Sequence, residues 1–112
     1  ISGVIHGAGV LADKRIAEKT DAQFDRVFDT KVRGLRALLA ATANDDLDVL
    51  CVFSSVSGRC GNNGQSVYAM ANEILAKVCH AERRQRPGAV VKSLGWGPWQ
   101  GGMVTPALAP ME

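Results

Sequence analysis

The fold can be deduced from one apolar run near the middle of the chain, Asp48-Val49-Leu50-Cys51-Val52-Phe53. Its apolar residues follow one another without polar alternation, a pattern typical of a strand that is covered on both faces in a parallel sheet. Shorter runs of the same kind stand at residues 4–5, before the turn His6-Gly7-Ala8-Gly9, and at residues 89–94. We expect all three runs to form strands.

The two segments between these strands have helical periodicity. We expect one helix over about residues 21–42, because Thr20 and Gln23 have the spacing of a capping box at its start. Its apolar side chains share one face at 100° per residue, and that face must be packed. A second helix is expected over about residues 66–86, ended by Pro87-Gly88.

The order strand, helix, strand, helix, strand predicts the α/β class with a parallel sheet. Right-handed crossovers would place both helices on the same face of this sheet. Residues 54–65 and 95–102 carry several glycines and are expected to be loops. The opposite face of the sheet would stay bare, so we expect additional sequence or a second copy of the chain to cover it.

Composition limits the possible functions. The chain has 112 residues, of which 46% are hydrophobic and 21% charged, as in an ordinary globular protein. It has no apolar run of the roughly 20 residues that span a membrane. Its net charge of +2 does not point to nucleic acid as a partner. Three cysteines are too few for a disulfide scaffold, so a cytoplasmic location is expected, and their spacing predicts no metal site.

A basic cluster lies near the end of the second predicted helix and comprises Arg83, Arg84, Arg86 and Lys92. Cations at a helix C-terminus complement its dipole. We therefore interpret the cluster as a solvated helix end rather than as a nucleic-acid patch, and an acidic carrier protein is the other partner that such a surface would attract.

Four polar residues are candidates for chemistry, and open α/β sheets bind ligands beyond the carboxyl ends of their strands. Ser55 follows the central strand. Lys31 falls within the apolar stripe of the first helix, so its ammonium must either snorkel to water or meet a buried polar partner. Tyr68, the only tyrosine, and Asn72 stand four residues apart on the inward face of the second helix. Each residue alone has a common structural explanation.

Together, these four residues resemble the active site of ketoreductase domains of polyketide and polyunsaturated fatty acid synthases, within the short-chain dehydrogenase/reductase superfamily. In that family the asparagine follows the tyrosine and the lysine comes from the earlier helix. The matching motifs run from Val4 to about Leu108 and are, in chain order, His6-Gly7-Ala8-Gly9-Val10-Leu11, Asp29-Thr30-Lys31-Val32-Arg33-Gly34, Phe53-Ser54-Ser55-Val56-Ser57-Gly58, Tyr68-Ala69-Met70-Ala71-Asn72 and Gly95-Trp96-Gly97-Pro98-Trp99. The segments Gly64-Gln65-Ser66 and Gly101-Gly102-Met103-Val104-Thr105-Pro106 look most like the polyunsaturated fatty acid synthase branch.

The resemblance implies a partial Rossmann-like fold with three parallel strands and two helices on one face. Residues 1–112 would be the C-terminal part of the NADP-binding domain, because the family's Gly-x-Gly-x-x-Gly motif and the strands before it are not in the chain. The abrupt strand-like opening, Ile1-Ser2-Gly3-Val4-Ile5-His6, and the loop at residues 106–112 also suggest a fragment.

The resemblance further implies an NADPH-dependent reduction of a β-ketoacyl thioester on an acyl carrier protein, within a multidomain synthase. Tyr68 would donate a proton to the carbonyl oxygen, and the Lys31 ammonium would stabilise the tyrosinate. Ser55 would hydrogen-bond the developing oxyanion, and Asn72 would hold Lys31 or a relay water. The residues expected beside the cofactor are His6, Ala8, Gly9, Gly97 and Pro98.

Two further expectations concern stereochemistry and the isolated chain. Leu11-Ala12-Asp13 partly matches the Leu-Asp-Asp signature of one stereochemical class, whereas Cys60 stands where the opposite class has tryptophan. The alternative to an enzyme is a catalytically silent or dimerising piece of a synthase, since the phosphate-binding half is missing. Its first strand would be an exposed edge, so we expect the isolated chain to be a homo-oligomer.

Overall fold

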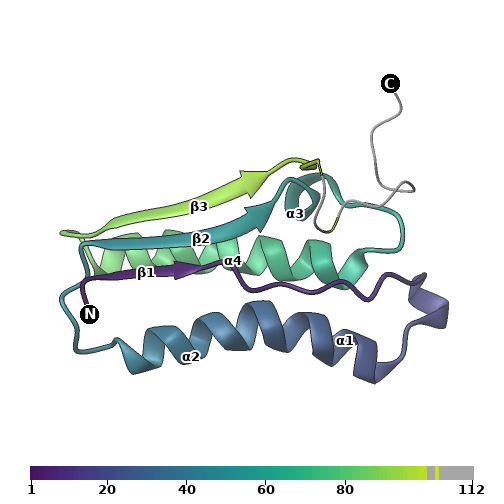
Figure 1. Ribbon diagram of the computed structural model, residues 1–112, viewed down its shortest axis with the longest axis horizontal. Coiled ribbons are helices and arrows are strands. Elements are labelled where there is room, and N and C mark those ends of the chain that lie inside the picture. Colours follow the sequence, from purple (N-terminus) through teal and green to yellow (C-terminus); the bar gives the residue numbers. More distant parts are fainter. Residues whose placement is uncertain (101–102, 104–112) are drawn as a thin grey trace.

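The computed structural model describes residues 1–100 and residue 103. It contains a three-stranded parallel sheet with the order β1 (Gly3–His6), β2 (Val49–Ser55), β3 (Val90–Trp96) (Figure 1). The predicted α/β class is confirmed. The third strand runs two residues beyond its predicted end, because Gly95 and Trp96 pair with Ser54 and Ser55 of an equally extended β2.

The first predicted helix is one helical rod with a wider turn in its middle. It comprises α1 (Asp21–Phe28), the π-helical segment η2 (Asp29–Arg33) and α2 (Gly34–Ala41). The capping box at its start is confirmed: the Gln23 amide donates to the Thr20 hydroxyl, and the Thr20 amide donates to the Gln23 side chain.

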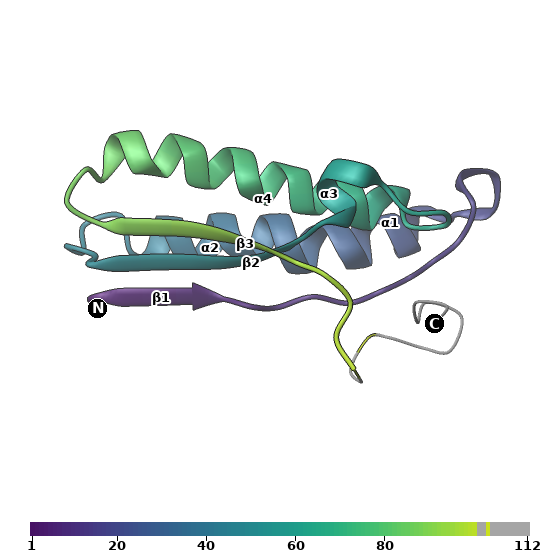
Figure 2. The same cartoon turned by 90° about the horizontal axis from the view of Figure 1, so that it is seen from above.

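The second predicted helix is α4 (Ser66–Gln85). Figure 2 shows α4 and the α1–α2 rod on the same side of the sheet, as expected. Two short elements complete the described part, η1 (Ile16–Glu18) and α3 (Ser57–Cys60). The prediction of loop throughout residues 54–65 was therefore wrong at α3, where the Ser55 hydroxyl accepts the amide hydrogen of Ser57 and starts a helical turn.

A single core lies between the sheet and the helices. Side chains from all three strands, from α2 and α4, and from the segment just before β2 meet there: Val4, Leu35, Leu47, Leu50, Val52, Leu75, Cys79 and Val91. On the opposite face Ile5 is 69% exposed and Val90 53% exposed. None of the elements in residues 1–100 covers that face (Figure 2), so the expectation of one bare face is confirmed.

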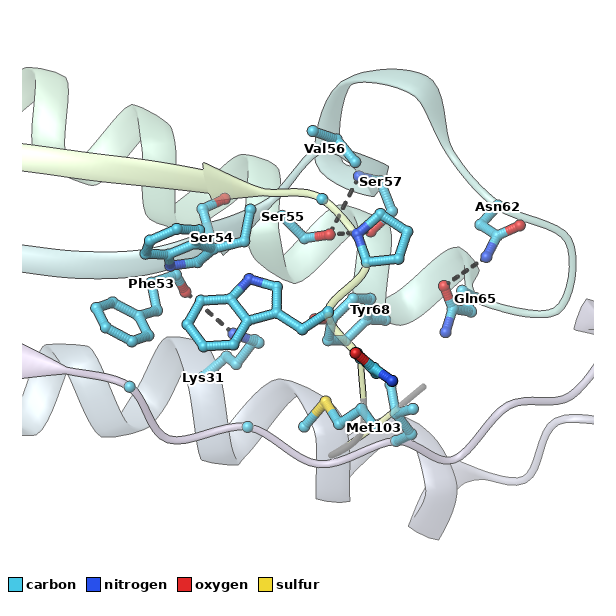
Figure 3. A pocket seen from close by; sticks show the side chains of 18 residues that line it. Lys31, Phe53, Ser54, Ser55, Val56, Ser57, Asn62, Gln65, Tyr68 and Met103 are labelled. Atoms are coloured by element: carbon cyan, nitrogen blue, oxygen red, sulfur yellow. Dashed lines mark hydrogen bonds between the residues drawn. The ribbon is translucent and has the colours of Figure 1, made fainter. Parts of the chain in front are cut away.

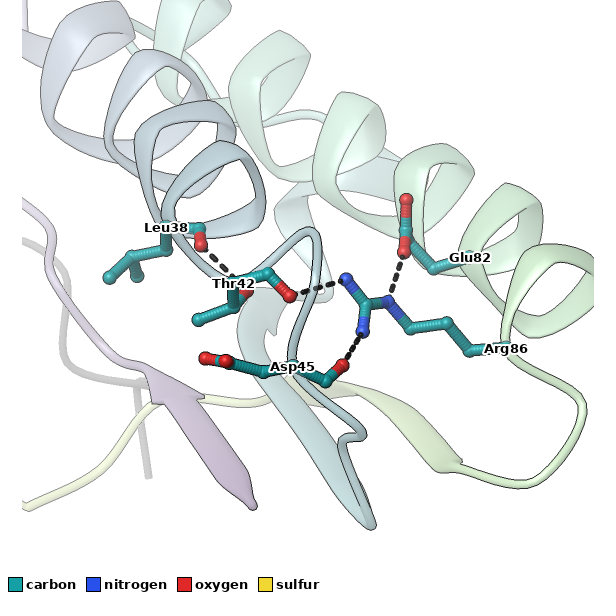
Figure 4. Close-up of polar contacts among 5 residues, drawn as sticks. All are labelled: Leu38, Thr42, Asp45, Glu82 and Arg86. Carbon is teal, nitrogen blue, oxygen red and sulfur yellow. Dashed lines mark hydrogen bonds and ion pairs between the residues drawn. The ribbon is translucent and has the colours of Figure 1, made fainter. Parts of the chain in front are cut away.

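Arg86 joins three segments at the end of the sheet where the strands begin (Figure 4). Its guanidinium donates to the carbonyl oxygens of Thr42 at 3.2 Å and Asp45 at 3.1 Å, and it pairs with the Glu82 carboxylate at 3.0 Å. Arg83 donates to the Val91 carbonyl. The basic cluster is thus partly structural. The Arg86 backbone amide donates to the Glu82 carbonyl at the end of α4, while its side chain caps the C-terminus of α2. No helix within the described residues is long and apolar enough to cross a membrane.

Candidate functional site

A cavity of about 410 Å³ opens at the carboxyl ends of the strands. Its volume lies in the range typical of small-molecule sites. Its lining comes from the turn after β1, from Lys31 of η2, from the end of β2 with α3, from the loop before α4 and the start of α4, and from the segment after β3. Figure 3 shows Lys31, Ser55 and Tyr68 around this cavity. The structure therefore brings three of the four predicted active-site residues to one edge of the sheet.

Lys31 projects from the π segment η2 and is only 4% exposed. Its ammonium donates to the Phe53 carbonyl oxygen at 3.2 Å and lies 5.5 Å from the centroid of the Tyr68 ring. Burial lowers the pKa of Lys31, since the charged form loses its hydration. Of the two interpretations left open for this lysine, the structure favours a buried polar partner and rejects snorkelling to water.

Tyr68 and Asn72 stand one turn apart in the first part of α4. Asn72 is fully buried and its amide donates to the Tyr68 carbonyl at 2.8 Å. Its Oδ1 is buried and has no hydrogen-bond partner within the described residues. The Asn72 side chain thus contacts the backbone of Tyr68 and not its phenol. Its side-chain oxygen, Oδ1, remains able to accept a hydrogen bond from a donor at the site.

Ser55 ends β2 with its hydroxyl oxygen 2.9 Å from the hydroxyl oxygen of Ser57. The neighbouring Ser54 donates to the Asn72 carbonyl at 3.0 Å and so ties β2 to α4. Gly58 lets α3 approach α4 closely, because a Cβ there would lie 3.0 Å from the Glu73 amide nitrogen. Ser54 and Ser57 were missed by sequence reasoning, although the Ser-Ser-x-Ser-Gly motif contains both.

The residues predicted to lie beside a cofactor fall into two groups. Gly9, Gly97 and Pro98 line the cavity. His6 and Ala8 do not belong to its lining. His6 is the last residue of β1, only 4% exposed, and its Nε2 lies 2.8 Å from the Lys31 carbonyl oxygen, so its ring is directed at the helix.

A polar network borders the cavity on the side of the segment that follows β1. Gln65 is buried, donates to the Asp13 carboxylate at 3.0 Å and accepts from the Asn62 amide at 2.9 Å. The Lys14 amide donates to the Gly64 carbonyl. These contacts join the segment after β1 to the loop before α4. Sequence reasoning missed the two contacts that join these loops, Gln65 to Asp13 and Lys14 to Gly64, because their partners are 50 or more positions apart.

Aromatic rings cover another side of the cavity. Trp96 packs edge-on against Phe53 at 5.7 Å and against Trp99 at 4.8 Å between ring centroids. The site thus combines an apolar wall with a phenol, a buried ammonium and a serine hydroxyl. Such a set can bind a carbonyl compound, hydrogen-bond its oxygen and deliver a proton to it. Residues 1–100 and 103 contain no group of three or more His, Cys, Asp or Glu side chains that could hold a metal ion.

Comparisons of the sequence and of the fold with known proteins point to one family. The family model described as KR domain matches residues 1–101. One polyunsaturated fatty acid synthase polypeptide from Thraustochytrium sp. is 47% identical over 96% of the chain, and one phenolphthiocerol/phthiocerol polyketide synthase polypeptide from Mycobacterium tuberculosis is 40% identical over 88%. The chain spans only 4% of the length of each of these relatives.

A solved ketoreductase domain from the bacillaene assembly line has the same arrangement of elements. It superimposes with a TM-score of 0.87 at 36% identity, over 96% of this chain and 27% of that structure. Part of the branch-specific segment, residues 101–102 and 104–106, lies outside the described residues.

Proposed function

Because the chain belongs to the KR domain family, the ketoreductases of polyketide and polyunsaturated fatty acid synthases, we propose that it forms the catalytic edge of an NADPH-dependent β-ketoacyl reductase. The observation that carries this proposal is the buried Lys31 ammonium, 5.5 Å from the Tyr68 ring at the mouth of the sheet. A buried charge is costly, and placing it against a phenol in a cavity is useful for proton transfer.

In the proposed reaction, Tyr68 donates its phenolic proton to the carbonyl oxygen of the substrate. The Lys31 ammonium stabilises the negative charge that remains on the phenol oxygen, because it is buried and lies over the ring of the same tyrosine. Ser55 donates a hydrogen bond to the oxygen while charge develops on it. In this proposal Oδ1 of Asn72, a buried acceptor without a hydrogen-bond partner among the described residues, accepts a hydrogen bond from Lys31 or from a relay water during the reaction.

A nicotinamide cofactor, NADPH in this proposal, supplies the hydride that reduces the carbonyl carbon. The residues that fit beside its nicotinamide are Gly9, Gly97 and Pro98, which line the cavity next to Lys31. Gly9 has to be small, since a Cβ there would lie 3.1 Å from Cε of Lys31. Glycine at positions 9 and 97 has no side chain and so lets the backbone approach a flat ring closely.

We further infer that the chain is the C-terminal part of a KR nucleotide-binding domain. Its 27% coverage of a solved ketoreductase supports this assignment, as does the bare sheet face around Ile5 and Val90, which leaves room for more of the same domain. The proposed substrate is a β-ketoacyl thioester on an acyl carrier protein, and the proposed partners are the other synthase domains. A cytoplasmic location remains a prediction.

The second candidate function is a catalytically silent piece that associates with itself through the bare face. The exposure of Ile5 and Val90 favours this alternative for the isolated chain. Light scattering of the isolated chain at high concentration tests it, and a monomer would contradict it. Binding of NADPH by the isolated chain at micromolar concentration would contradict the expectation that this chain alone is inactive.

Substitution of Tyr68 by phenylalanine, in the full polypeptide that carries the chain, tests the reductase proposal. We expect NADPH consumption with a β-ketoacyl thioester to fall by about 10²- to 10⁴-fold, the usual contribution of general acid catalysis. Met70→Leu, two positions away on the exposed side of α4, is the matched control and should keep the wild-type rate. Full turnover by a folded Tyr68→Phe variant would rule out the proton-donor role.

A further inference from the structure

His6, the last residue of β1, contacts the helical rod through its side chain. Its ring is buried against the helical rod, and Nε2 lies 2.8 Å from the carbonyl oxygen of Lys31. A carbonyl oxygen can only accept, so Nε2 must carry the hydrogen and donate it. This contact fixes the tautomer of His6 and leaves the imidazole outside the cavity lining.

The carbonyl that His6 holds belongs to the π segment. There the Gly34 amide bonds to Asp29, five residues earlier, as well as to Lys31. π turns are rare and occur mostly as single wide turns within α-helices. If this turn relaxed to an α-helical one, Lys31 would rotate about the helix axis, because successive residues of an α-helix are separated by 100°. A contact from outside the helix can hold the wide turn.

Gly34, the residue that follows the π segment, leaves space for the His6 ring. The His6 ring packs over Gly34, where a Cβ would already touch the ring at 3.4 Å. Glycine inside a helix costs about 1 kcal/mol relative to alanine. The other end of the lysine is held by the next strand, since the ammonium donates to the Phe53 carbonyl of β2. Two adjacent parallel strands thus fix the backbone and the ammonium of one residue.

We propose that His6 is a positioning residue that holds the π turn through the Lys31 carbonyl and thereby places the Lys31 ammonium against Tyr68. The role rests on the proposed reductase function and deepens it, because it acts on the same lysine. It differs from the expectation that His6 lies beside the cofactor. The two roles separate kinetically: a positioning role affects kcat, whereas a cofactor contact affects the KM for NADPH.

The test uses three variants of the full polypeptide that carries the chain. His6→Leu removes the donor, with His6→Met as its substitute if the leucine variant does not fold, and His6→Gln retains a donor of similar reach. Val4→Ala, on the same buried face of β1, controls for a general loss of stability. We expect His6→Leu to lower kcat by about 10- to 100-fold, as small misplacements do. The KM for NADPH should stay within about twofold, and His6→Gln should recover most of the loss.

A second readout does not depend on activity. The acylation rate of Lys31, followed by peptide mass spectrometry, should rise at least severalfold in His6→Leu but not in His6→Gln or Val4→Ala. Equal acylation in His6→Leu and wild type would overturn the positioning role, as would a raised KM for NADPH with unchanged kcat. A wild-type protein without reductase activity would refute the proposed function alone, and the acylation rates would still decide the role of His6.

Discussion

Replacing Lys31 with methionine is expected to abolish reduction and, at the same time, to stabilise the fold. Burial lowers the pKa of Lys31, which means that the folded protein accommodates the charged ammonium less well than water does. Methionine keeps the length of the apolar stem and fills the same space without the charge. A residue selected only for stability would not be a buried lysine at this position.

The magnitude follows from the contacts of the ammonium. Its hydrogen bond to the Phe53 carbonyl contributes about 1.5–3 kcal/mol, and its contact with the Tyr68 ring contributes about 0.5–2 kcal/mol. Removing the ion from water costs several kcal/mol, so the two contacts only partly offset the cost. We expect Lys31→Met to be about 0–2 kcal/mol more stable than wild type at neutral pH.

Denaturant unfolding of both proteins at several pH values measures this difference. The folded pKa of Lys31 lies below the unfolded one, so the unfolded state binds the proton more tightly and stability rises with pH. The free energy of unfolding of the wild type should therefore rise relative to that of Lys31→Met as pH approaches the ordinary lysine pKa of about 10.4. A variant that is more than about 1 kcal/mol less stable than wild type would refute the reasoning, because the ammonium would then be a net stabilising group.

Other sites give sharper structural tests. Arg86→Met should lose about 3–5 kcal/mol in denaturant unfolding, because it leaves Glu82 and two carbonyl oxygens without their partner; a loss below about 1 kcal/mol would show that the contacts are exchanged for water. Gly9→Ala should lower the reductase kcat, since its Cβ would lie 3.1 Å from Cε of Lys31, and an unchanged kcat would contradict the close fit. Burial raises the pKa of Cys79 to about 11, so its alkylation at pH 8 should be on the order of a hundredfold slower than that of an unperturbed thiol. Alkylation of Cys79 at the ordinary rate would show that α4 opens readily.

Much of the fold could be predicted because its signals are local. The capping box at Thr20 and the apolar periodicity gave the start and the inward face of the first helix, and the unbroken apolar run gave β2. The π segment could not be predicted, since the apolar stripe resumes at Leu35 and a single wide turn leaves the pattern of residue types unchanged. Similarly, α3 depends on hydrogen bonds of Ser55 and on the close approach at Gly58.

For the candidate site, residue types were predictable and their backbone partners were not. Lys31, Ser55 and Tyr68 were predicted from their spacing and from the family resemblance, and the structure places them around one cavity. The contacts that hold them use carbonyl oxygens of Phe53 and Lys31, which every amino acid possesses. Because such contacts place no demand on the identity of the accepting residue, they leave no trace in the sequence.

The 20-residue helix α4 separates the candidate site from the contacts of Arg86. At 1.5 Å per residue the helix is about 30 Å long, with Tyr68 near its start and Arg86 just beyond its end. Free-energy effects of substitutions more than about 10 Å apart usually add. Protein engineers could therefore improve stability around Arg86 and change the proposed reductase site around Tyr68 separately, and then combine the two sets of substitutions.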